Sequence, residues 1–346
     1  MKLGTVLIRA DASVEVGTGH VMRCLALAQT WQDAGGEAAF AMAESTPAIL
    51  ERLKAERIEV HEVREGPGTP NDAKLTLDVA KACGAEWMVV DGYVFGADYQ
   101  RRVKDAGLRL LWVDDDGSAR HYCADIVLNQ NVHARPSFYS SRDTSCRLLL
   151  GPKYAVLRRE FNPRQKRKRE ISARGNKVLI TMGGSDSGNV SLRVVEALRE
   201  VSVQNLEAVV VIGGSSPHFE SVAQAALSFP GVMRAQRDAL NMPELMAWAD
   251  IAVSAAGSTC WEMCMMGLPA VVIDVAANQS AIAEGLSRLA VSVHAGSSES
   301  LSTEALAAEV ERLLLSSECR SAMSRRGHEL VDGEGTLRVM SELQRV

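Results

Sequence analysis

The sequence lacks the features that mark several large classes of protein. Its seven cysteines are odd in number and scattered, and no Cys-x-x-Cys pair or nearby histidine completes a zinc site beside Cys260 and Cys264, so neither a disulfide framework nor a zinc site is expected. Cys260 and Cys264 share one helix face, where packing is a simpler role than metal ligation. No apolar run is long enough to span a membrane, and the N-terminus lacks the long apolar core of a secretory signal.

The charge balance excludes a further group of functions. A net charge of −5 gives no general attraction to nucleic acid or to an anionic membrane. We therefore expect a cytoplasmic protein that acts on a small molecule, binds no nucleic acid, uses no metal or cofactor and does not insert into a membrane.

What the sequence does contain is an alternation of strand-like and helix-like segments. Its 346 residues suit two domains of roughly 150 residues each. Apolar strands are expected at residues 3–8, 37–43, 58–63, 87–90, 109–113, 126–128, 148–150, 177–182, 206–212, 250–254 and 269–274. Helical segments separate many of them, for example 47–56, 75–83 and 242–249. This alternation predicts an α/β protein with parallel sheets covered by helices on both faces.

The boundary between the domains is expected at a basic stretch. Residues 158–177 hold nine Lys and Arg residues, few apolar ones, Pro163 and Gly175. Without interleaved aromatic residues, this composition favours a solvated linker over a nucleic-acid patch. We predict a first domain over 1–160, a linker over 161–176, a second domain over 177–330, and a last helix over 331–346 that can cross back to the first domain.

The stretch from Arg9 to Ala28 is the most distinctive one. An apolar strand enters it, residues 17–19 form a turn of small residues, and apolar residues then follow at helical spacing. His20 is therefore placed in the first turn of a helix, where the positive end of the helix dipole disfavours a second proton on the imidazole. A neutral, partly exposed histidine suits a general base; the alternative is a βα turn whose histidine only packs. Asp11 is the candidate for orienting His20 or a water, and Gly17, Gly19 and Arg23 are candidate substrate contacts.

Polar residues follow several predicted strands of the first half. Tyr93, Asp114 and residues 129–131 stand at such positions. Because ligands of open α/β sheets bind outside the carboxyl ends of the strands, we expect these residues and Asp11 to share a rim with His20. For each residue taken singly, a capping or turn role is an equal alternative.

Three strand-to-helix turns of the second half, residues 183–189, 213–216 and 255–259, are rich in Gly and Ser. Small residues in such turns let backbone N–H groups face a phosphate. Glu262, one turn into the helix after the third turn, can bind a vicinal diol such as a ribose, or it can simply complement the helix dipole. No Gly-x-Gly-x-x-Gly occurs in either half. The pattern therefore favours a nucleoside diphosphate site over a dinucleotide site. Its candidate residues are Gly184, Ser185, Gly257, Ser258, Thr259, Glu262, Asn278 and Gln279.

Taken in order, these motifs closely resemble the UDP-sugar hydrolases of pseudaminic acid biosynthesis, which remove UDP from UDP-2,4-diacetamido-2,4,6-trideoxy-β-L-altropyranose. The matching segments are residues 9–13, 17–28, 91–93, 114–115, 125–131, 151–161, 182–186, 246–250, 256–262 and 278–279. That family is related to inverting glycosyltransferases of the GT-B type. The resemblance implies a GT-B-like fold, with two Rossmann-like domains facing a cleft and UDP held by the second. It also implies a place in nonulosonic acid biosynthesis, and so in flagellin glycosylation or cell-surface polysaccharide.

The resemblance also implies roles for particular residues. His20 matches the catalytic histidine, Tyr93 and Asn278 match positions near the sugar, and Gly184 and Ser185 match the phosphate loop. Ser258, Thr259 and Glu262 match the diphosphate and ribose turn, and uracil recognition is implied for the backbone from Leu240 to Met242. The chain departs from its relatives around Ala276-Ala277 and in residues 288–296, which concerns the identity of the sugar more than the reaction.

The expected reaction is a single displacement at the anomeric carbon. His20 would take a proton from water while UDP leaves from the opposite face, and helix N-termini would stabilise the charge on UDP without a metal or a general acid. A GT-B glycosyltransferase, in which an acceptor hydroxyl replaces water, is the first alternative. A hydrolase of a different nucleotide-diacetamido sugar is the second, and a nucleotide-sugar binding protein without chemistry is the third.

Overall fold

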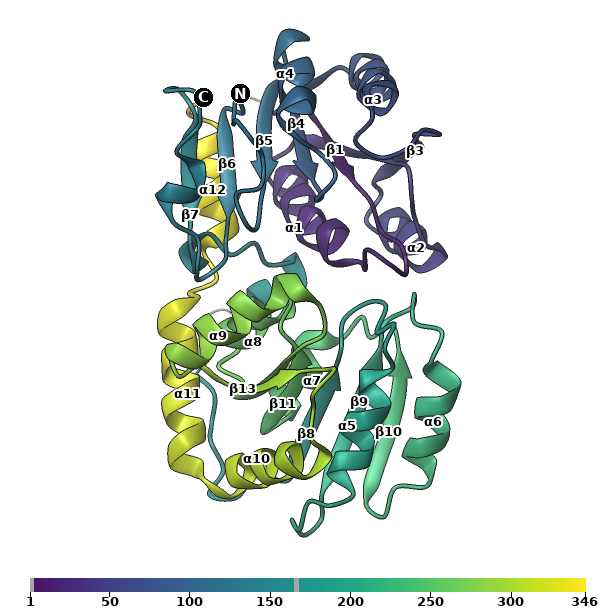
Figure 1. Cartoon of the computed structure of the whole chain (residues 1–346), viewed down its shortest axis with the longest axis vertical. Coiled ribbons are helices and arrows are strands. Elements are labelled where there is room, and N and C mark those ends of the chain that lie inside the picture. Colours follow the sequence, from purple (N-terminus) through teal and green to yellow (C-terminus); the bar gives the residue numbers. More distant parts are fainter. Residues whose placement is uncertain (1–2, 165–167) are drawn as a thin grey trace. The chain divides into compact units, whose positions relative to one another are not determined.

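Each half of the chain builds its own parallel sheet. The computed structural model describes residues 3–164 and 168–346, so residues 165–167 of the predicted linker lie outside the described residues. The chain divides into two units: unit 1 comprises Met1–Arg159 and Gly333–Val346, and unit 2 comprises Glu160–Asp332. The two sheets are drawn in Figure 1. The predicted α/β class with two Rossmann-like halves is confirmed.

The sheet of unit 1 has seven strands in the order β3-β2-β1-β4-β5-β6-β7, and all of its pairs are parallel. The strands are β1 (Thr5–Ala10), β2 (Glu37–Met42), β3 (Glu59–Glu62), β4 (Ala85–Asp91), β5 (Arg109–Val113), β6 (Ile126–Asn129) and β7 (Arg147–Leu150). The central strands are apolar on both faces, as expected for a sheet covered on both sides.

Helices cover both faces of this sheet. Side chains of α1 (Gly19–Asp33), α2 (Pro47–Ala55) and α12 (Gly335–Leu343) join one apolar cluster, and those of α3 (Pro70–Ala82) and α4 (Ala97–Asp105) join the other. Helix α3 begins earlier than the predicted residue 75, because the Thr69 hydroxyl accepts from the Asp72 N–H and Pro70 occupies the first helical position. Short 3-10 turns, η1 (Pro136–Tyr139), η2 (Pro152–Tyr154) and η3 (Arg159–Arg164), complete the described chain up to residue 164.

Unit 2 repeats the plan with six strands in the order β10-β9-β8-β11-β12-β13, again all parallel. The strands are β8 (Lys177–Thr181), β9 (Glu207–Ile212), β10 (Val232–Arg237), β11 (Ile251–Ala255), β12 (Ala270–Asp274) and β13 (Ser292–Ser297). This strand order is that of a nucleotide-binding doubly wound sheet.

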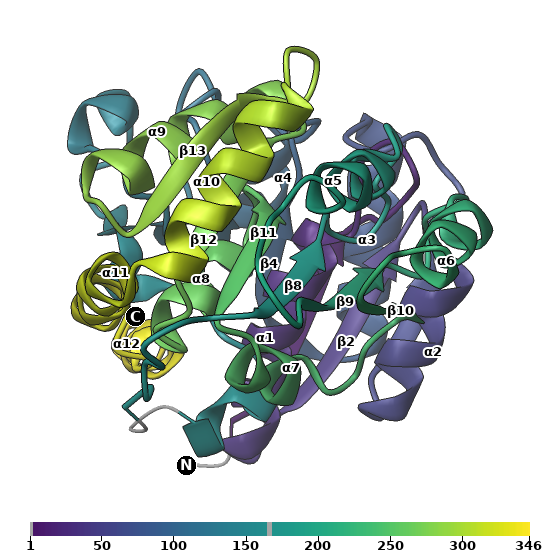
Figure 2. The same ribbon diagram turned by 90° about the horizontal axis from the view of Figure 1, so that it is seen from below.

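One face of the second sheet is covered by α5 (Val190–Leu198), α6 (Phe219–Leu227) and α10 (Thr303–Leu315), which lie next to one another (Figure 2). The other helices of this unit are α7 (Met242–Trp248), α8 (Thr259–Met265), α9 (Ser280–Arg288) and α11 (Ser317–Leu330), with the 3-10 turn η4 (Ala277–Gln279) before α9. Each strand-to-helix turn named in the sequence therefore lies at the carboxyl edge of this sheet.

The described part of the basic stretch is not simply solvated. The Arg169 guanidinium donates to the carbonyl oxygens of Met246, Ala249 and Met266. Burial lowers the pKa of Arg169 to about 10. The expectation of a solvated linker is wrong at this residue, because its charge is held by main-chain oxygens of unit 2.

Candidate active site

The turn before α1 places His20 at the carboxyl edge of the unit 1 sheet. Ser13 and Gly17 form a bridge, and Gly17 takes a φ of +80°, a conformation that favours glycine. Gly19 is the first residue of α1, and a Cβ built on it would meet nothing within 4 Å. His20 follows as the second residue of the helix and is 6% exposed. The predicted position in the first helical turn is confirmed, but the ring is more buried than expected.

A carboxylate fixes the orientation of the His20 ring. Nδ1 of His20 lies 2.6 Å from Oδ1 of Asp91, the buried last residue of β4. Because an ionised carboxylate only accepts hydrogen bonds, the proton is assigned to Nδ1, and Nε2 keeps its lone pair. Within the residues described, Nε2 has no hydrogen-bond partner. A histidine held in this way can accept a proton at Nε2.

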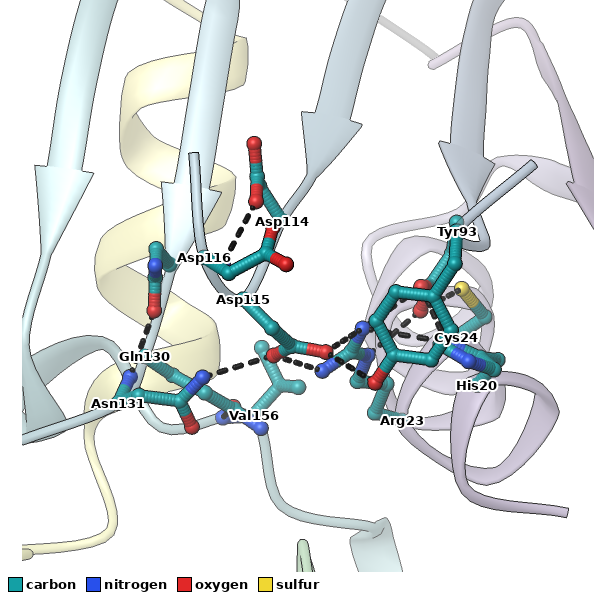
Figure 3. Close-up of polar contacts among 12 residues, drawn as sticks. His20, Arg23, Cys24, Tyr93, Asp114, Asp115, Asp116, Gln130, Asn131 and Val156 are labelled. Atoms are coloured by element: carbon teal, nitrogen blue, oxygen red, sulfur yellow. Dashed lines mark hydrogen bonds and ion pairs between the residues drawn. The ribbon is translucent and has the colours of Figure 1, made fainter. Parts of the chain in front are cut away.

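Arg23 lies one helical turn after His20 and joins two carboxylates (Figure 3). Its guanidinium donates two bonds to Asp91, at 2.6 and 2.7 Å, and two bonds to Asp115, at 2.7 and 3.0 Å. Sequence analysis made Arg23 a substrate contact. The structure corrects this assignment, because the side chain is buried and its guanidinium makes four hydrogen bonds to carboxylates of unit 1.

The charges of this cluster keep both carboxylates ionised. Burial by itself would raise the pKa of Asp91, but the charge of Arg23 and the hydrogen bonds from Arg23 and His20 hold it well below its ordinary value. The same balance, dominated by Arg23, lowers the pKa of Asp115. Burial would lower the pKa of Arg23, yet its two acidic partners raise it well above the ordinary value.

Tyr93 and Asn131 complete the cluster. The Tyr93 hydroxyl donates to Asp115 at 3.0 Å, and the Tyr93 ring packs edge-on against His20 with centroids 4.7 Å apart. The Asn131 side-chain amide donates to the other Asp115 oxygen at 2.7 Å. Tyr93 is 47% exposed, so it is the member of this cluster that a ligand can reach most easily. The expected shared rim is therefore present for His20, Tyr93 and Asn131.

Asp11 does not join His20. One of its oxygens accepts from Arg9 at 2.6 Å and from the backbone N–H groups of Ala43 and Glu44. Arg9 is fully buried and also pairs with Asp72. The group that contacts the imidazole is Asp91, so the assignment of Asp11 to that role is corrected: its carboxylate instead ties the ends of β1 and β2 together.

The remaining polar residues of the rim stabilise turns. Asp114 accepts from the N–H groups of Asp116 and Gly117 and from the Tyr122 hydroxyl, and burial raises its pKa. The Asn129 side-chain amide donates to the Tyr139 hydroxyl, and Oε1 of the Gln130 side chain accepts from the Val156 N–H. For Asp114, Asn129 and Gln130, the structure therefore shows the capping or turn role that was the alternative to a ligand contact.

In unit 2, two of the three glycine-rich turns are held by acidic side chains of the protein itself. Asp186 accepts from the N–H groups of Val190 and Ser191, the first residues of α5. Asp238 accepts from the Gly214 N–H at 2.6 Å in the neighbouring turn. A helix N-terminus that already holds a carboxylate has less to offer a phosphate. Asp186 therefore occupies two N–H groups at the start of α5, and the expectation that the Gly184-Ser185 turn faces the diphosphate stays a prediction.

The third turn leads into α8. Ser258 is the N-cap residue, and its side chain makes no capping bond. Gly257, Ser258 and Thr259 are half-buried. A Cβ built on Gly257 would lie 3.9 Å from Nε2 of Gln279, so the turns after β11 and β12 meet there. Gln279 is itself fixed by accepting from the Val275 N–H.

The other predicted residues of unit 2 lie on its surface or near this turn. Glu262 is half-buried in the first turn of α8, and Asn278 is exposed in η4. Leu240 is 71% exposed just before α7, whereas Met242 is buried as the first residue of that helix.

Two further features of the described residues bear on the site. None of their groupings of His, Cys, Asp and Glu has the arrangement of a metal site. Their helices include none with the length and apolar character needed to cross a membrane.

Asp91 and Asp115 are the members of the His20 cluster that sequence reasoning left without a role. Both follow apolar strands, in the segments 91–93 and 114–115, so a signal was present. What the sequence does not show is which aspartate meets His20, since Asp91 is 71 positions away.

Comparisons with known proteins bear on the second unit and on the whole chain. Residues 178–335 match the family model described as glycosyltransferase family 28 C-terminal domain. The spore coat polysaccharide biosynthesis protein SpsG of Bacillus subtilis is 25% identical over 97% of both chains. A UDP-2,4-diacetamido-2,4,6-trideoxy-β-L-altropyranose hydrolase of Campylobacter jejuni is 26% identical over 64% of this chain and 74% of its own. An uncharacterised protein of Methanocaldococcus jannaschii is 25% identical over 78% of this chain, which spans 55% of that relative's length.

Solved structures share the fold at low identity. MurG of Acinetobacter baumannii superposes with a TM-score of 0.67 at 16% identity, covering 99% of this chain and 100% of its own. The calicheamicin glycosyltransferase CalG4 gives a TM-score of 0.63 at 14% identity, covering 99% of this chain and 98% of its own. The chain therefore has the GT-B fold. Its second unit matches a glycosyltransferase domain model, and one of its relatives is a UDP-sugar hydrolase.

Proposed function

We propose that this chain hydrolyses UDP-2,4-diacetamido-2,4,6-trideoxy-β-L-altropyranose to UDP and the free sugar. The observation that carries the proposal is the His20–Asp91 pair, which leaves Nε2 of a positioned imidazole as a proton acceptor beside the exposed Tyr93. The hydrolase of Campylobacter jejuni among the relatives supports this choice of substrate.

In the proposed step, water attacks the anomeric carbon while the bond from that carbon to the UDP oxygen breaks. The water proton passes to Nε2 of His20, and UDP leaves with the bonding electron pair. The imidazolium then returns its proton to solvent. Asp91 is a positioning residue here: it holds the ring in one tautomer and stabilises the positive charge as it forms. Attack from the side opposite UDP inverts the anomeric centre.

Unit 2 is proposed to bind the nucleotide. The turn of Gly257, Ser258 and Thr259 suits the diphosphate, because its small residues allow close approach and the Ser258 side chain makes no capping bond. The Gly184-Ser185 backbone is proposed as a second contact. The candidate ribose ligand is Glu262, the candidate sugar contacts are Tyr93, Asn278 and Gln279, and the backbone from Leu240 to Met242 is the candidate uracil contact.

The test is turnover without an acceptor. Purified protein is incubated with the UDP-sugar, and the anomeric proton is followed by NMR. We expect UDP and the inverted free sugar to appear together, and we expect His20→Gln to abolish nearly all of this signal. Binding of UDP without consumption of the UDP-sugar would contradict the hydrolase and leave a binding protein or another nucleotide sugar.

A glycosyltransferase is the second candidate, and a specific observation favours it. The matched family model is a glycosyltransferase domain, and the fold is shared with glycosyltransferases. The same His20 would then take its proton from an acceptor hydroxyl. The two candidates separate in one experiment, in which glycerol is added as a surrogate acceptor. A glycoside product and faster consumption favour transfer, whereas unchanged release of free sugar favours hydrolysis.

Either reaction fits a role in building a surface polysaccharide. SpsG of Bacillus subtilis is a spore coat polysaccharide biosynthesis protein, and the Campylobacter jejuni relative acts on a deoxyamino sugar nucleotide. We propose that the product of this chain enters a nonulosonic acid or a related cell-surface glycan.

A further inference from the structure

The cluster around His20 holds more negative than positive charge. Asp91 and Asp115 are ionised, and Arg23 is the guanidinium that joins them. With a neutral imidazole, the four side chains carry one positive and two negative charges. A proton on His20 would make them electrically balanced. The three partners are at most slightly exposed, so little solvent screens these charges.

The charge of Asp115 matters to His20 because Arg23 lies between them in the cluster of hydrogen bonds. One guanidinium nitrogen of Arg23 lies 3.2 Å from Nδ1 of His20, so the cation stands directly beside the ring that must become positive. Asp91 alone would be shared between that cation and the imidazole. The bidentate pairing with Asp115 offsets the charge of Arg23 and leaves Asp91 available to the imidazolium.

The protein holds Asp115 firmly in this position. Its two oxygens together accept two bonds from Arg23, one from the Tyr93 hydroxyl and one from the Asn131 amide. Its own backbone carbonyl lies 3.1 Å from Nε2 of His133. Four donors on one carboxylate fix both its geometry and its ionised state.

Other titratable and charged groups also face His20 or its partners. Helix α1 contributes Arg23, Cys24 and the positive end of its own dipole, and the end of β4 contributes Asp91 and Tyr93. Asp114 and Asp116 stand beside Asp115 after β5, and His133 follows β6. Cys24 donates to Asp91, and burial raises the pKa of its thiol, so it adds no charge.

We propose that Asp115 is a positioning residue that makes His20 a stronger base by offsetting the charge of Arg23 beside the imidazole. This inference rests on the proposed role of His20 as the proton acceptor. Asp115 is hydrogen-bonded to Arg23 rather than to the imidazole, and in the proposed step it does not contact the reacting atoms. Because its negative charge offsets that of Arg23 beside the ring, its removal would change the proton affinity of the site as well as the rate.

The first test is Asp115→Asn, which removes the charge and keeps the shape. The variant loses a negative charge near the imidazole, so we expect the low-pH limb of its kcat profile to move about one pH unit lower. Its plateau rate should fall roughly tenfold, because a weaker base takes the proton less readily. Tyr93→Phe is the matched control: it removes a bond to Asp115 without removing charge, and its low-pH limb should stay in place.

A charge swap protects the test against simple damage to the fold. The double variant Asp115→Asn with Asn131→Asp exchanges the carboxylate and the amide of one hydrogen-bonded pair. It restores the net charge of the cluster, so we expect its low-pH limb to move back toward that of the unchanged protein. A purely structural role for Asp115 predicts no such return.

A second readout does not depend on turnover. The ring nitrogens of His20 are followed by NMR as the pH is changed, and their signals are assigned by their loss in His20→Gln. In Asp115→Asn the titration of this ring should move to lower pH by about one unit. Coincident titration curves for the two proteins would overturn the proposal. A shifted curve in a protein that consumes no UDP-sugar would instead retain the proposal and reject the hydrolase.

Discussion

The two units use the same kind of sheet for opposite purposes. At the carboxyl edge of unit 1, charged side chains from α1 and from the ends of β4 and β5 bind one another in a buried cluster. At the carboxyl edge of unit 2, the turns after β8, β9 and β11 are built of glycine and serine, and two of them close so tightly that a Cβ on Gly213 would lie 2.3 Å from the backbone of Gly184.

The difference fits the roles that we propose for the two edges. A proton acceptor needs charges fixed at short distance, because electrostatic effects weaken quickly with distance and with exposure to water. A diphosphate is bound well by backbone N–H groups, which need small residues and close approach. The same topology therefore supports a side-chain site in one unit and a backbone site in the other.

The largest expected effect tests the side-chain edge of unit 1. His20→Gln should lower kcat by about a hundredfold or more, because the proposed general base is lost, while UDP affinity is nearly unchanged. Turnover of the UDP-sugar and calorimetry with UDP measure the two quantities. His121→Gln is the control, since its ring pairs with Asp143 in the same unit, away from the cluster. Near-normal turnover in His20→Gln would contradict the assignment of His20 as the general base.

A stability measurement tests whether that edge depends on its buried charges. Arg23→Met leaves Asp91 and Asp115 together without their cation, which should cost about 3–5 kcal/mol of unfolding free energy. Urea unfolding measures it. Arg325→Met breaks an exposed pair with Glu329 and should change the free energy by less than about 1 kcal/mol. Equal effects of the two substitutions would mean that the cluster is not a special feature of unit 1.

Two glycines test the backbone edge of unit 2. Gly257→Ala has room in the fold, so the protein should stay folded while UDP affinity falls about tenfold, because a methyl group obstructs close approach. Gly213→Ala meets the backbone of Gly184 and should lower the melting temperature instead. Calorimetry and thermal unfolding separate the two results. Undiminished UDP affinity in Gly257→Ala would contradict the Gly257 turn as the diphosphate contact and point to another turn.

The smallest expected effect is a change at low pH in how far Asp115→Asn lowers the melting temperature. Because the pKa of Asp115 is lowered in the folded protein, its stabilising effect is full above about pH 4 and is lost as the pH falls through the lowered pKa. The melting temperature of Asp115→Asn should therefore lie below that of the unchanged protein at pH 6. As the pH approaches 3, the unchanged protein loses the stabilisation from Asp115, so the difference between the two melting temperatures should become smaller. Each kcal/mol of lost stabilisation should reduce this difference by about 2–4 °C. Asp143→Asn, at an exposed site, serves as the control, and a gap independent of pH would contradict the assignment.

The sequence was a good guide to the sheets and a poor one to the partners of each side chain. Apolar runs located the central strands because both of their faces are buried. The edge strand β10 and the helix α4 were not predicted, since β10 reads Val-Met-Arg-Ala-Gln-Arg without an apolar run and α4 buries only Tyr99, Gln100 and Val103. Burial on a single face leaves too weak an apolar pattern.

The candidate site shows the same limit more sharply. His20 was located by its turn, which is a local feature of the chain. Asp11 and Arg23 stand beside it in the sequence, yet Asp11 binds Arg9 and Arg23 binds Asp91 and Asp115. Which acid pairs with which base depends on contacts between β1, β4 and β5, and local spacing does not encode them.

The last helix of the chain has a consequence for the order of synthesis. Val339, Met340 and Leu343 of α12 belong to the same buried cluster as α1, although all of unit 2 separates them in the sequence. A ribosome therefore completes unit 2 before it releases the segment that covers unit 1. Until residues 333–346 emerge, the first-made half of this protein keeps an apolar stripe open to water, and the second-made half is the first that can finish folding.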